Sequence, residues 1–262
     1  MRVIAIANNK GGVGKTATTH ALGVALASAG YHVLMVDLDP QGTLTTACGI
    51  RDAAGRSIAT LLDDDGSNVP PLTRAMRPLA RRLTLVPAER ALSATETALA
   101  GRVLRERALK RILTPVSGYY HVCLLDCPPS CGLITINALT AAQAVLVPTQ
   151  PQAADLAALK SFLATIDSVR ANYNPRLELL GIVVTFYDDR LIHHRAIVAK
   201  MREDKLPLME TMIGRSIRVA EAVGAEQSIV DFVARNPQAQ AYVRLAQEVA
   251  RSMGGMSPGN RC

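Results

Sequence analysis

A short glycine-rich run near the N-terminus constrains this chain more than any other feature: Lys10-Gly11-Gly12-Val13-Gly14-Lys15-Thr16. Before it lies an apolar run, residues 3–7, with the length and composition of a buried parallel strand. After it, residues 17–29 carry Leu22 and Leu26 on one face of a predicted helix. A strand, a glycine-rich turn and Gly-Lys-Thr at the start of a helix are the context that a phosphate-binding loop requires, whereas a turn that binds nothing needs no such pattern.

The residue types in this loop suit a nucleotide phosphate. Glycines let backbone N–H groups approach a phosphate without a Cβ in the way, and the start of the following helix adds partial positive charge. We expect Lys15 to reach the β- and γ-phosphates and Thr16 to offer its hydroxyl to Mg²⁺. The loop departs from the general Gly-x-x-x-x-Gly-Lys-Thr pattern at Asn9, which replaces a glycine, and at Lys10, a second lysine.

That second lysine makes the loop similar to the deviant Walker A motif of the ParA/MinD group of P-loop ATPases, which is part of the SIMIBI class. Two later stretches agree with the resemblance, residues 36–42 (Val-Asp-Leu-Asp-Pro-Gln-Gly) and residues 124–129 (Leu-Leu-Asp-Cys-Pro-Pro). Their order and spacing resemble the ParA branch most closely, over about residues 1–250. The resemblance implies nucleotide contacts, with ATP or ADP, from these residues: Lys10, Gly11, Gly12, Val13, Gly14, Lys15, Thr16 and Ala17. Ala17 stands where relatives commonly have threonine, so one hydroxyl near the α-phosphate is missing.

Length and patterning predict one α/β domain. The chain has 262 residues, of which 49% are hydrophobic, and apolar strand-like runs alternate with helix-like runs from end to end. We expect a mostly parallel, doubly wound sheet with helices on both faces, formed by residues 1–252 and followed by a flexible tail, residues 253–262. Expected strands are residues 31–37, 83–86, 120–126, 144–148 and 179–185. Expected helices are residues 91–113, 132–142, 153–171, 192–202 and 238–252, and residues 43–82 are less regular.

Composition also limits the compartment and the partners. No apolar run is long enough to cross a bilayer, and the first strand begins too early for a signal peptide, so we expect a cytoplasmic protein. The net charge of +7 suits a polyanion, either nucleic acid or a membrane surface. Aromatic residues make up 3% and Trp is absent, which disfavours base stacking. DNA contacts should therefore be made to phosphates, with a dependence on salt but not on sequence.

Three aspartates follow predicted strands, at the sheet edge where open α/β folds bind ligands. Asp126 ends an apolar strand before Pro-Pro, which is the Walker B arrangement for holding Mg²⁺. The resemblance implies that Asp39 positions or activates the attacking water. It leaves Asp37 a supporting role near Thr16 and the metal. A polar strand end with an Asp-Pro turn is the simpler alternative for this pair.

The resemblance extends to the base and to DNA. Residues 185–190 close a strand in a region that helps to enclose adenine in the family, and we expect Thr185 and Ile213 to lie at the base. Residues 213–222 resemble a ParA stretch whose arginines contribute to nonspecific DNA binding. We extend that role to a set of cations, each of which is otherwise an ordinary surface residue: Arg195, Lys200, Arg202, Arg215, Arg218 and Arg235. The basic run from Arg102 to Arg111 is interpreted as a solvated outer helix face.

The leading hypothesis is therefore an ATP hydrolase of the ParA kind. It would form a homodimer with ATP, Lys10 would touch the partner's nucleotide, and the dimer would bind double-stranded DNA on the nucleoid. A ParB-like protein would stimulate its weak basal activity, and the cargo would be plasmid or chromosomal DNA. Alternatives remain: a ParA-like ATPase that positions a protein cargo, and a MinD-like membrane-cycling ATPase, for which the tail offers no amphipathic helix. An iron–sulfur carrier would require paired cysteines, whereas Cys123, Cys127 and Cys131 suit reduced structural thiols. A scaffold that binds nucleotide without hydrolysing it is the last alternative.

Overall fold

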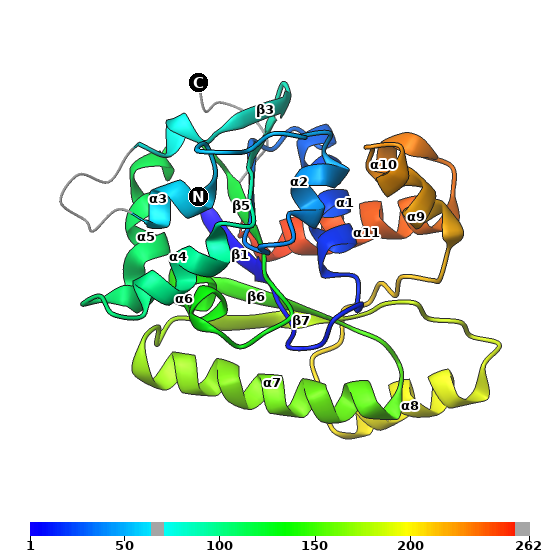
Figure 1. The fold of residues 1–262 in the computed structure, drawn as a ribbon. Coiled ribbons are helices and arrows are strands. Elements are labelled where there is room, and N and C mark those ends of the chain that lie inside the picture. The colour runs from blue at the N-terminus through cyan, green and yellow to red at the C-terminus, as the bar shows by residue number, and fades with distance from the viewer. Residues whose placement is uncertain (64–70, 255–262) are drawn as a thin grey trace.

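The computed structural model describes residues 1–63 and 71–254, which form a seven-stranded sheet with helices on both faces (Figure 1). The strand order is β3-β4-β2-β5-β1-β6-β7, and every neighbouring pair is parallel except β3 and β4. The expected mostly parallel, doubly wound sheet is confirmed. The strands are β1 (Arg2–Ile6), β2 (Val33–Asp37), β3 (Arg77–Ala80), β4 (Leu83–Val86), β5 (Val122–Asp126), β6 (Ala144–Thr149) and β7 (Glu178–Val184).

Side chains that alternate along the strands divide the core into two layers, because successive residues of a strand point to opposite faces. On β1, Ile4 and Ile6 belong to one layer, and Val3 and Ala5 to the other. The Ile4 layer is covered by α1 (Lys15–Ser28), α2 (Thr43–Ala47), α9 (Ile217–Gly224), α10 (Ile229–Phe232) and α11 (Pro237–Ser252). The Val3 layer is covered by α3 (Ile58–Leu62), α4 (Leu92–Leu99), α5 (Ala108–Leu113), α6 (Leu133–Ala141), α7 (Ala153–Asn172) and α8 (Ile192–Glu203).

Two expectations about local structure were wrong. The helix expected over residues 91–113 is broken into α4 and α5, with a loop and the 3₁₀ turn η2 (Arg105–Arg107) between them. In this loop Leu104 has φ = 56°, a left-handed value that no α-helix contains. The irregular stretch before residue 83 includes an antiparallel edge strand, β3, which pairs with β4. Two further 3₁₀ turns of the same length, η1 (Leu72–Arg74) and η3 (Thr114–Val116), were also unforeseen.

The edge of the sheet at β7 is covered by an extended segment, residues 207–213, which the sequence analysis did not find. Ile182 donates to the carbonyl of Pro207 (2.8 Å) and accepts from Met209 (2.9 Å), and Ile213 donates to Val184 (2.8 Å). The unpaired backbone groups of β7 are thereby satisfied, as an edge strand requires. This segment leads directly from the β7 edge to α9.

The carboxyl ends of the central strands bring the motif residues together. Ile6 and Asp37 are each in register with Asp126, from the two sides of β5. The glycine-rich loop follows Ile6 directly, so that the loop and both aspartates lie at one edge of the sheet. This is the edge at which open α/β sheets bind ligands.

Helix α1 approaches β2 closely at Gly23. A Cβ added there would overlap Sδ of Met35 on β2, well inside van der Waals contact. We expect Gly23→Val to lower the free energy of unfolding by about 1–3 kcal/mol, because the side chain overpacks this contact. Urea denaturation measures the change. Gly224→Val, at a helical glycine with nothing within 4 Å of the added Cβ, is the matched control, and an equal loss in both variants would contradict the explanation.

Among the described residues, no helix has both the length and the apolar character that a bilayer span requires. The tail expected over residues 253–262 is described only at Met253 and Gly254, and Met253 is buried in the core rather than frayed. The rest of that tail lies outside the described residues. Within the less regular stretch expected over residues 43–82, residues 64–70 also lie outside the described residues.

Candidate active site

The glycine-rich loop between β1 and α1 is held by side chains that bind its carbonyl groups, two from other segments and one, Lys15, from the loop itself. Gln150 donates to the carbonyl of Gly12 (2.8 Å), Thr185 to that of Val13 (2.9 Å), and Lys15 to that of Lys10 (2.9 Å). Gly14 has φ = 85°, a conformation that favours glycine. Because side chains hold these carbonyl groups, the N–H groups of the loop remain available to bind an anion.

The start of α1 adds to this anion site. Gly14 caps the helix without a side-chain hydrogen bond, and the first turn contains no acidic residue. Its N–H groups and the positive end of the helix dipole are therefore available to a phosphate. Lys15 is buried, and burial lowers its pKa; Asp126 is the largest of the charges that oppose this shift. A buried ammonium is stabilised by an anion, and a phosphate group would supply one.

Asp126 at the end of β5 is fully buried and only partly satisfied. Burial raises its pKa well above the usual range, and the neighbouring charge of Asp37 raises it further. Hydrogen bonds from Thr16 and Thr19 and the charge of Lys15 act in the opposite direction. Oδ2 of Asp126 has no hydrogen-bond partner among the described residues. An orphaned carboxylate oxygen beside the Thr16 hydroxyl fits a divalent cation.

The same donor set favours magnesium. Among the described residues, no three His, Cys, Asp or Glu side chains converge on one point. A complete protein cage is therefore absent from that part of the chain. Mg²⁺ is typically bound by one or two protein oxygens together with substrate phosphates and water, and Thr16 and Asp126 are the residues here that could supply such oxygens.

Both carboxylate oxygens of Asp37 accept hydrogen bonds from the segment that follows β2, so neither is left free for a metal ion. Its Oδ2 accepts hydrogen bonds from the backbone N–H (2.9 Å) and hydroxyl (2.7 Å) of Thr45, and Oδ1 accepts from Asp39 N–H (3.1 Å). Burial, the leading cause, raises the pKa of Asp37 to about 6. Asp39 is half-buried, and its Oδ1 accepts from Gln41 N–H (2.9 Å). Asp37 thus fixes the loop that presents Asp39.

Lys10 forms an ion pair with α7. Its Nζ lies 2.6 Å from Oδ2 of Asp155, in the first turn of that helix. Asp155 is 1% exposed, whereas the Lys10 side chain is 36% exposed. Oδ1 of Asp155 has no hydrogen-bond partner among the described residues. The second lysine of the loop is therefore held by an aspartate distant in sequence, and it remains accessible to solvent.

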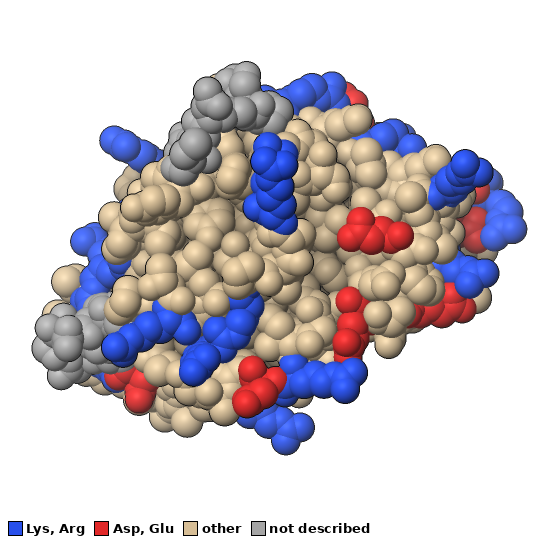
Figure 2. Space-filling view, turned by 90° about the horizontal axis from the view of Figure 1, so that it is seen from above, with Lys and Arg blue, Asp and Glu red and all other residues tan. Residues whose placement is uncertain are grey.

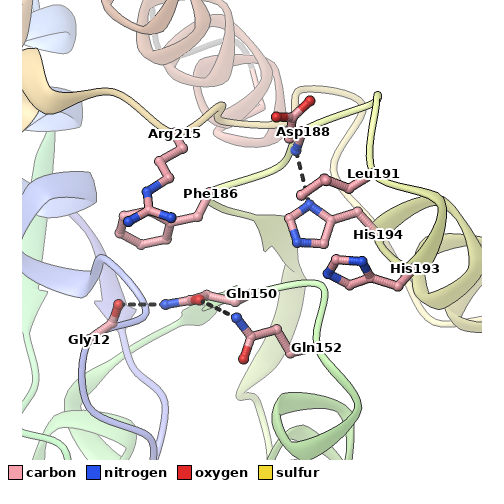
Figure 3. A pocket seen from close by; sticks show the side chains of 9 residues that line it. All are labelled: Gly12, Gln150, Gln152, Phe186, Asp188, Leu191, His193, His194 and Arg215. Carbon is pink, nitrogen blue, oxygen red and sulfur yellow. Dashed lines mark hydrogen bonds between the residues drawn. The ribbon is translucent and has the colours of Figure 1, made fainter.

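A cavity of about 480 Å³ opens beside the loop at Gly12 (Figure 3). Two side chains face the cavity from different segments: Phe186 comes from the loop directly after β7, and Arg215 from the residues just before α9. His194 of α8 lies further along the same wall. Phe186 has φ = 52° and its ring is 3.5 Å from a Cβ placed on Gly14. Left-handed backbone at a large side chain is uncommon and often marks a functional site.

The two residues expected at the adenine base do not line this cavity. Thr185 is buried behind the loop, where its hydroxyl lies within hydrogen-bond distance of the Val13 (2.9 Å) and Thr149 (3.1 Å) carbonyls. Ile213 is buried in the core and hydrogen-bonds β7 through its backbone. The polar strand end thus supports the glycine-rich loop, and Phe186, one residue later, is the residue of this stretch that begins the cavity wall.

Comparisons with known proteins agree with this geometry. A family model described as an AAA domain (AAA_31) matches residues 1–179. The chain is 39% identical over 254 residues to the chromosome partitioning protein ParA of Caulobacter vibrioides, with 95% of this chain and 94% of that protein covered. It is 41% identical over 250 residues to the chromosome-partitioning ATPase Soj of Thermus thermophilus, with 95% of each covered. The chain belongs to the ParA/Soj family of P-loop ATPases.

One solved structure of a relative contains a bound nucleotide and a metal ion. A Mycobacterium smegmatis protein described as cobyrinic acid a,c-diamide synthase is 34% identical, with a TM-score of 0.84 and complete coverage of both chains, and it contains an ATP analogue and magnesium. The same protein has also been solved with ADP and magnesium. This ParA/Soj-family chain is accordingly a magnesium-dependent ATPase whose nucleotides are ATP and ADP.

The cations expected to bind DNA are divided between helices on opposite faces of this ParA/Soj-family fold. They are Arg195, Lys200 and Arg202 on α8, and Arg215, Arg218 and Arg235 around α9 and before α11. Several have local partners: Lys200 pairs with Asp204 (3.1 Å), and Arg218 with Glu221 (2.8 Å). On the face shown in Figure 2, Lys and Arg are scattered among Asp and Glu rather than gathered into one patch.

A second cavity, of about 420 Å³, is more strongly basic. Arg190, Arg215 and Arg244 line it at the start of α11. Hydrogen bonds from Arg190, at 2.8 and 3.0 Å, lower the pKa of Asp188 to about 2, so this acid is ionised and neutralised. Arg215 also lines the cavity beside Gly12, and it therefore lies between the two cavities.

Within residues 185–190 the sequence pointed to Thr185 rather than Phe186, and it gave no indication of Gln150, Asp155 or Arg244. None lies in a recognisable motif, and each reaches the site from a segment distant from the glycine-rich loop. Among the cysteines, Cys123 and Cys127 are buried free thiols and Cys131 is exposed. Burial raises the pKa of the two buried thiols, so they stay protonated and are poor metal ligands, in agreement with structural thiols.

Proposed function

We propose that this ATPase partitions DNA: it dimerises with ATP, binds duplex DNA without sequence preference, and responds to a ParB-like partner. The full-length similarity to proteins named for chromosome partitioning supports this role. The observation that carries the dimer is Lys10, an accessible ammonium at the phosphate loop that its own chain holds through Asp155. The expected site would be the nucleoid in the cytoplasm, with plasmid or chromosomal DNA as the cargo.

In this proposal each loop residue has a defined role. Lys15 and the amides from Gly11 to Ala17 bind the phosphates, and Phe186 and Arg215 enclose the base. Thr16 and Asp126 hold Mg²⁺, which neutralises charge on the β- and γ-phosphates. Asp39, presented by Asp37, orients the attacking water. Most of the catalysis comes from positioning and charge stabilisation.

Lys10 completes the site from the partner subunit. In a two-fold dimer that faces loop to loop, each Lys10 would leave Asp155 and contact the partner's triphosphate, while the second subunit excludes water. In this exchange the Lys10 ammonium gives up the Asp155 carboxylate and gains the triphosphate, which carries more negative charge. ATP would thereby favour the dimer, and loss of the γ-phosphate would favour separation.

The Asp155→Asn variant tests this exchange. The substitution removes the charge that holds Lys10 in the monomer, so we expect ATP-dependent dimers to form at about tenfold lower protein concentration. Analytical ultracentrifugation with a nonhydrolysable ATP analogue measures the midpoint. Asp167→Asn on the same helix, where Asp167 pairs with Arg170, is the matched control. Dimerisation that is unchanged or weaker in Asp155→Asn would contradict the exchange.

DNA phosphates would bind at the basic cavity on the β7 side of the molecule. Arg215 and Arg244 form no ion pair with a described residue, and both line the cavity at the start of α11. The position of Arg215 between the two cavities supports a coupling of nucleotide and DNA binding. Fluorescence anisotropy with a labelled duplex tests the function. We expect binding with ATP but not ADP, weakened by salt and independent of sequence, and equal binding with ATP, ADP or no nucleotide would contradict it.

Arg244→Ala and Arg215→Ala should each weaken DNA binding in the ATP state. The matched control is Arg176→Ala, an exposed arginine far from this cavity in sequence. The ParA-like alternative, in which a protein cargo is moved over the nucleoid, shares all of this biochemistry. It differs only in the partner, so stimulation of ATP hydrolysis by a ParB-like DNA-binding protein would favour DNA partition.

One solved relative favours a second candidate, ATP-dependent amide synthesis on a corrinoid, because it is described as a cobyrinic acid a,c-diamide synthase. This activity would require the substrate carboxylate to reach the γ-phosphate from the cavity beside Gly12. Cobyrinic acid and an ammonia source added to the ATPase assay distinguish the candidates. Stimulated hydrolysis with amide formation would support synthesis, and an unchanged rate would support partition.

A further inference from the structure

The loop between α4 and α5 displays two aliphatic side chains to solvent. Val103 is 88% exposed and Leu104 is 57% exposed. Figure 1 shows this loop at the left edge of the molecule, standing out from the body beside α4 and α5. Leu104 also has φ = 56°, which is a costly conformation for a leucine outside the core. A solvated helix face explains neither the exposed pair nor the strained backbone.

Cations surround this pair in the sequence. Arg107, Lys110 and Arg111 are exposed and form no ion pair with any described residue. Glu106, the acidic residue of this stretch, accepts a hydrogen bond from Arg105 (3.0 Å) and is thereby neutralised. We call Val103, Leu104, Arg107, Lys110 and Arg111 the α4–α5 surface. It combines bare aliphatic groups with unpaired positive charge.

The loop is anchored at both ends, so the surface is presented on fixed backbone. Asn137 on α6 donates to the carbonyl of Arg105 (2.8 Å) and accepts from the backbone N–H of Leu109 (3.1 Å). Arg102 donates to the carbonyl of Leu62 (2.9 Å) at the end of α3. A surface held in this way binds a partner with little loss of conformational entropy.

The surface also has a direct connection to the phosphate loop. Glu96 on α4 accepts from the backbone N–H of Ile134 (3.1 Å), in the first turn of α6. Helix α6 follows the loop that begins after Asp126, and in that loop Pro129 is 3.8 Å from a Cβ placed on Gly11. α4 and α6 therefore connect the α4–α5 surface to the loop that packs against the glycine-rich loop.

We propose that the α4–α5 surface binds an acidic segment of a partner protein that carries aliphatic or aromatic side chains. Carboxylates would pair with Arg107, Lys110 and Arg111, and apolar side chains would cover Val103 and Leu104. Duplex DNA matches the charge but gains nothing from two aliphatic groups. A bilayer is disfavoured because the pair offers about half the carbons of a myristoyl chain, which alone binds only marginally. The proposal does not depend on the partition role.

A random-peptide display library, selected on the full-length protein and counter-selected on the Val103→Ser/Leu104→Ser double variant, tests the proposal. Both positions are exposed, so the double variant should fold and keep its basal ATPase rate. We expect enriched peptides with a net negative charge and apolar residues. In fluorescence anisotropy, the Kd of a synthetic peptide should rise about tenfold in the double variant and in Arg107→Glu/Lys110→Glu/Arg111→Glu.

Val243→Ser and Arg176→Glu, substitutions of exposed residues elsewhere, are the matched controls and should leave the Kd unchanged. Selection of no peptide, or of peptides without net negative charge, would overturn the proposal. So would an affinity that is unchanged in both surface variants. If the double variant instead loses binding to phosphatidylglycerol vesicles or to duplex DNA, the surface belongs to lipid or to DNA.

Discussion

Replacement of Lys10 by alanine is expected to abolish ATP-dependent dimers and to lower the ATPase rate by about 100-fold or more. The physical reason is that Lys10 would neutralise charge on the partner's triphosphate, in a site that excludes water only when two subunits meet. ATP affinity of the monomer should stay within a few fold, because Lys10 is held by Asp155, not by its own phosphate site. Analytical ultracentrifugation, a steady-state ATPase assay and nucleotide anisotropy measure the three quantities.

The matched control is Lys160→Ala, which removes an exposed lysine of α7 that pairs with Asp204 (2.9 Å). It should dimerise and hydrolyse ATP as the unchanged protein does. Dimers of normal stability in the Lys10→Ala variant would remove Lys10 from the interface. A large loss of monomer ATP affinity would instead place Lys10 in its own subunit's site.

The Lys15→Ala variant is expected to lose ATP affinity by about 100-fold or more, and with it dimerisation and hydrolysis. Lys15 is buried at the start of α1, where its ammonium would move from the Lys10 carbonyl to the phosphates. Isothermal titration calorimetry with Mg·ATP measures the loss. The free protein should remain folded, as circular dichroism would report.

Lys15→Arg separates charge from geometry. It keeps the charge but places a larger, planar group beside Asp126, so we expect weak binding and no hydrolysis. The two lysines should therefore differ: the Lys10→Ala variant should bind ATP without forming dimers, whereas the Lys15→Ala variant should fail to bind ATP. Normal ATP affinity in Lys15→Ala would show that the phosphates bind elsewhere.

The parts of the site that sequence could predict are those in which adjacent residues define the geometry. Gly12, Gly14 and Lys15 form one turn between a strand and a helix, and the apolar runs on both sides establish that context. Asp37 and Asp126 each end an apolar strand, and a parallel sheet brings such strand ends to one edge. The structure places the two residues opposite each other on the neighbouring strands β2 and β5. The mostly parallel fold follows from the alternation of strand and helix.

The remaining features depend on contacts between distant segments. Asp155 has no motif around it, and only the packing of α7 against the loop reveals its pairing with Lys10. Phe186 reaches the cavity through a left-handed backbone that no local pattern predicts. The broken helix between residues 91 and 113 follows from the anchoring of its middle by Asn137 on α6.

An intermolecular complementation assay tests most directly whether Lys10 acts on the partner's nucleotide. The Lys10→Ala and Asp39→Ala variants should each be nearly inactive alone. A dimer of unlike subunits keeps one Lys10 contact and has one complete site. Mixed in equal amounts, the variants should therefore recover part of the normal ATPase rate, with an upper limit of about a quarter if subunits paired at random and a lower value because each mixed dimer lacks one of the two Lys10 contacts. No recovery in a mixture that demonstrably forms mixed dimers would show that Lys10 acts within its own subunit, and would contradict the account.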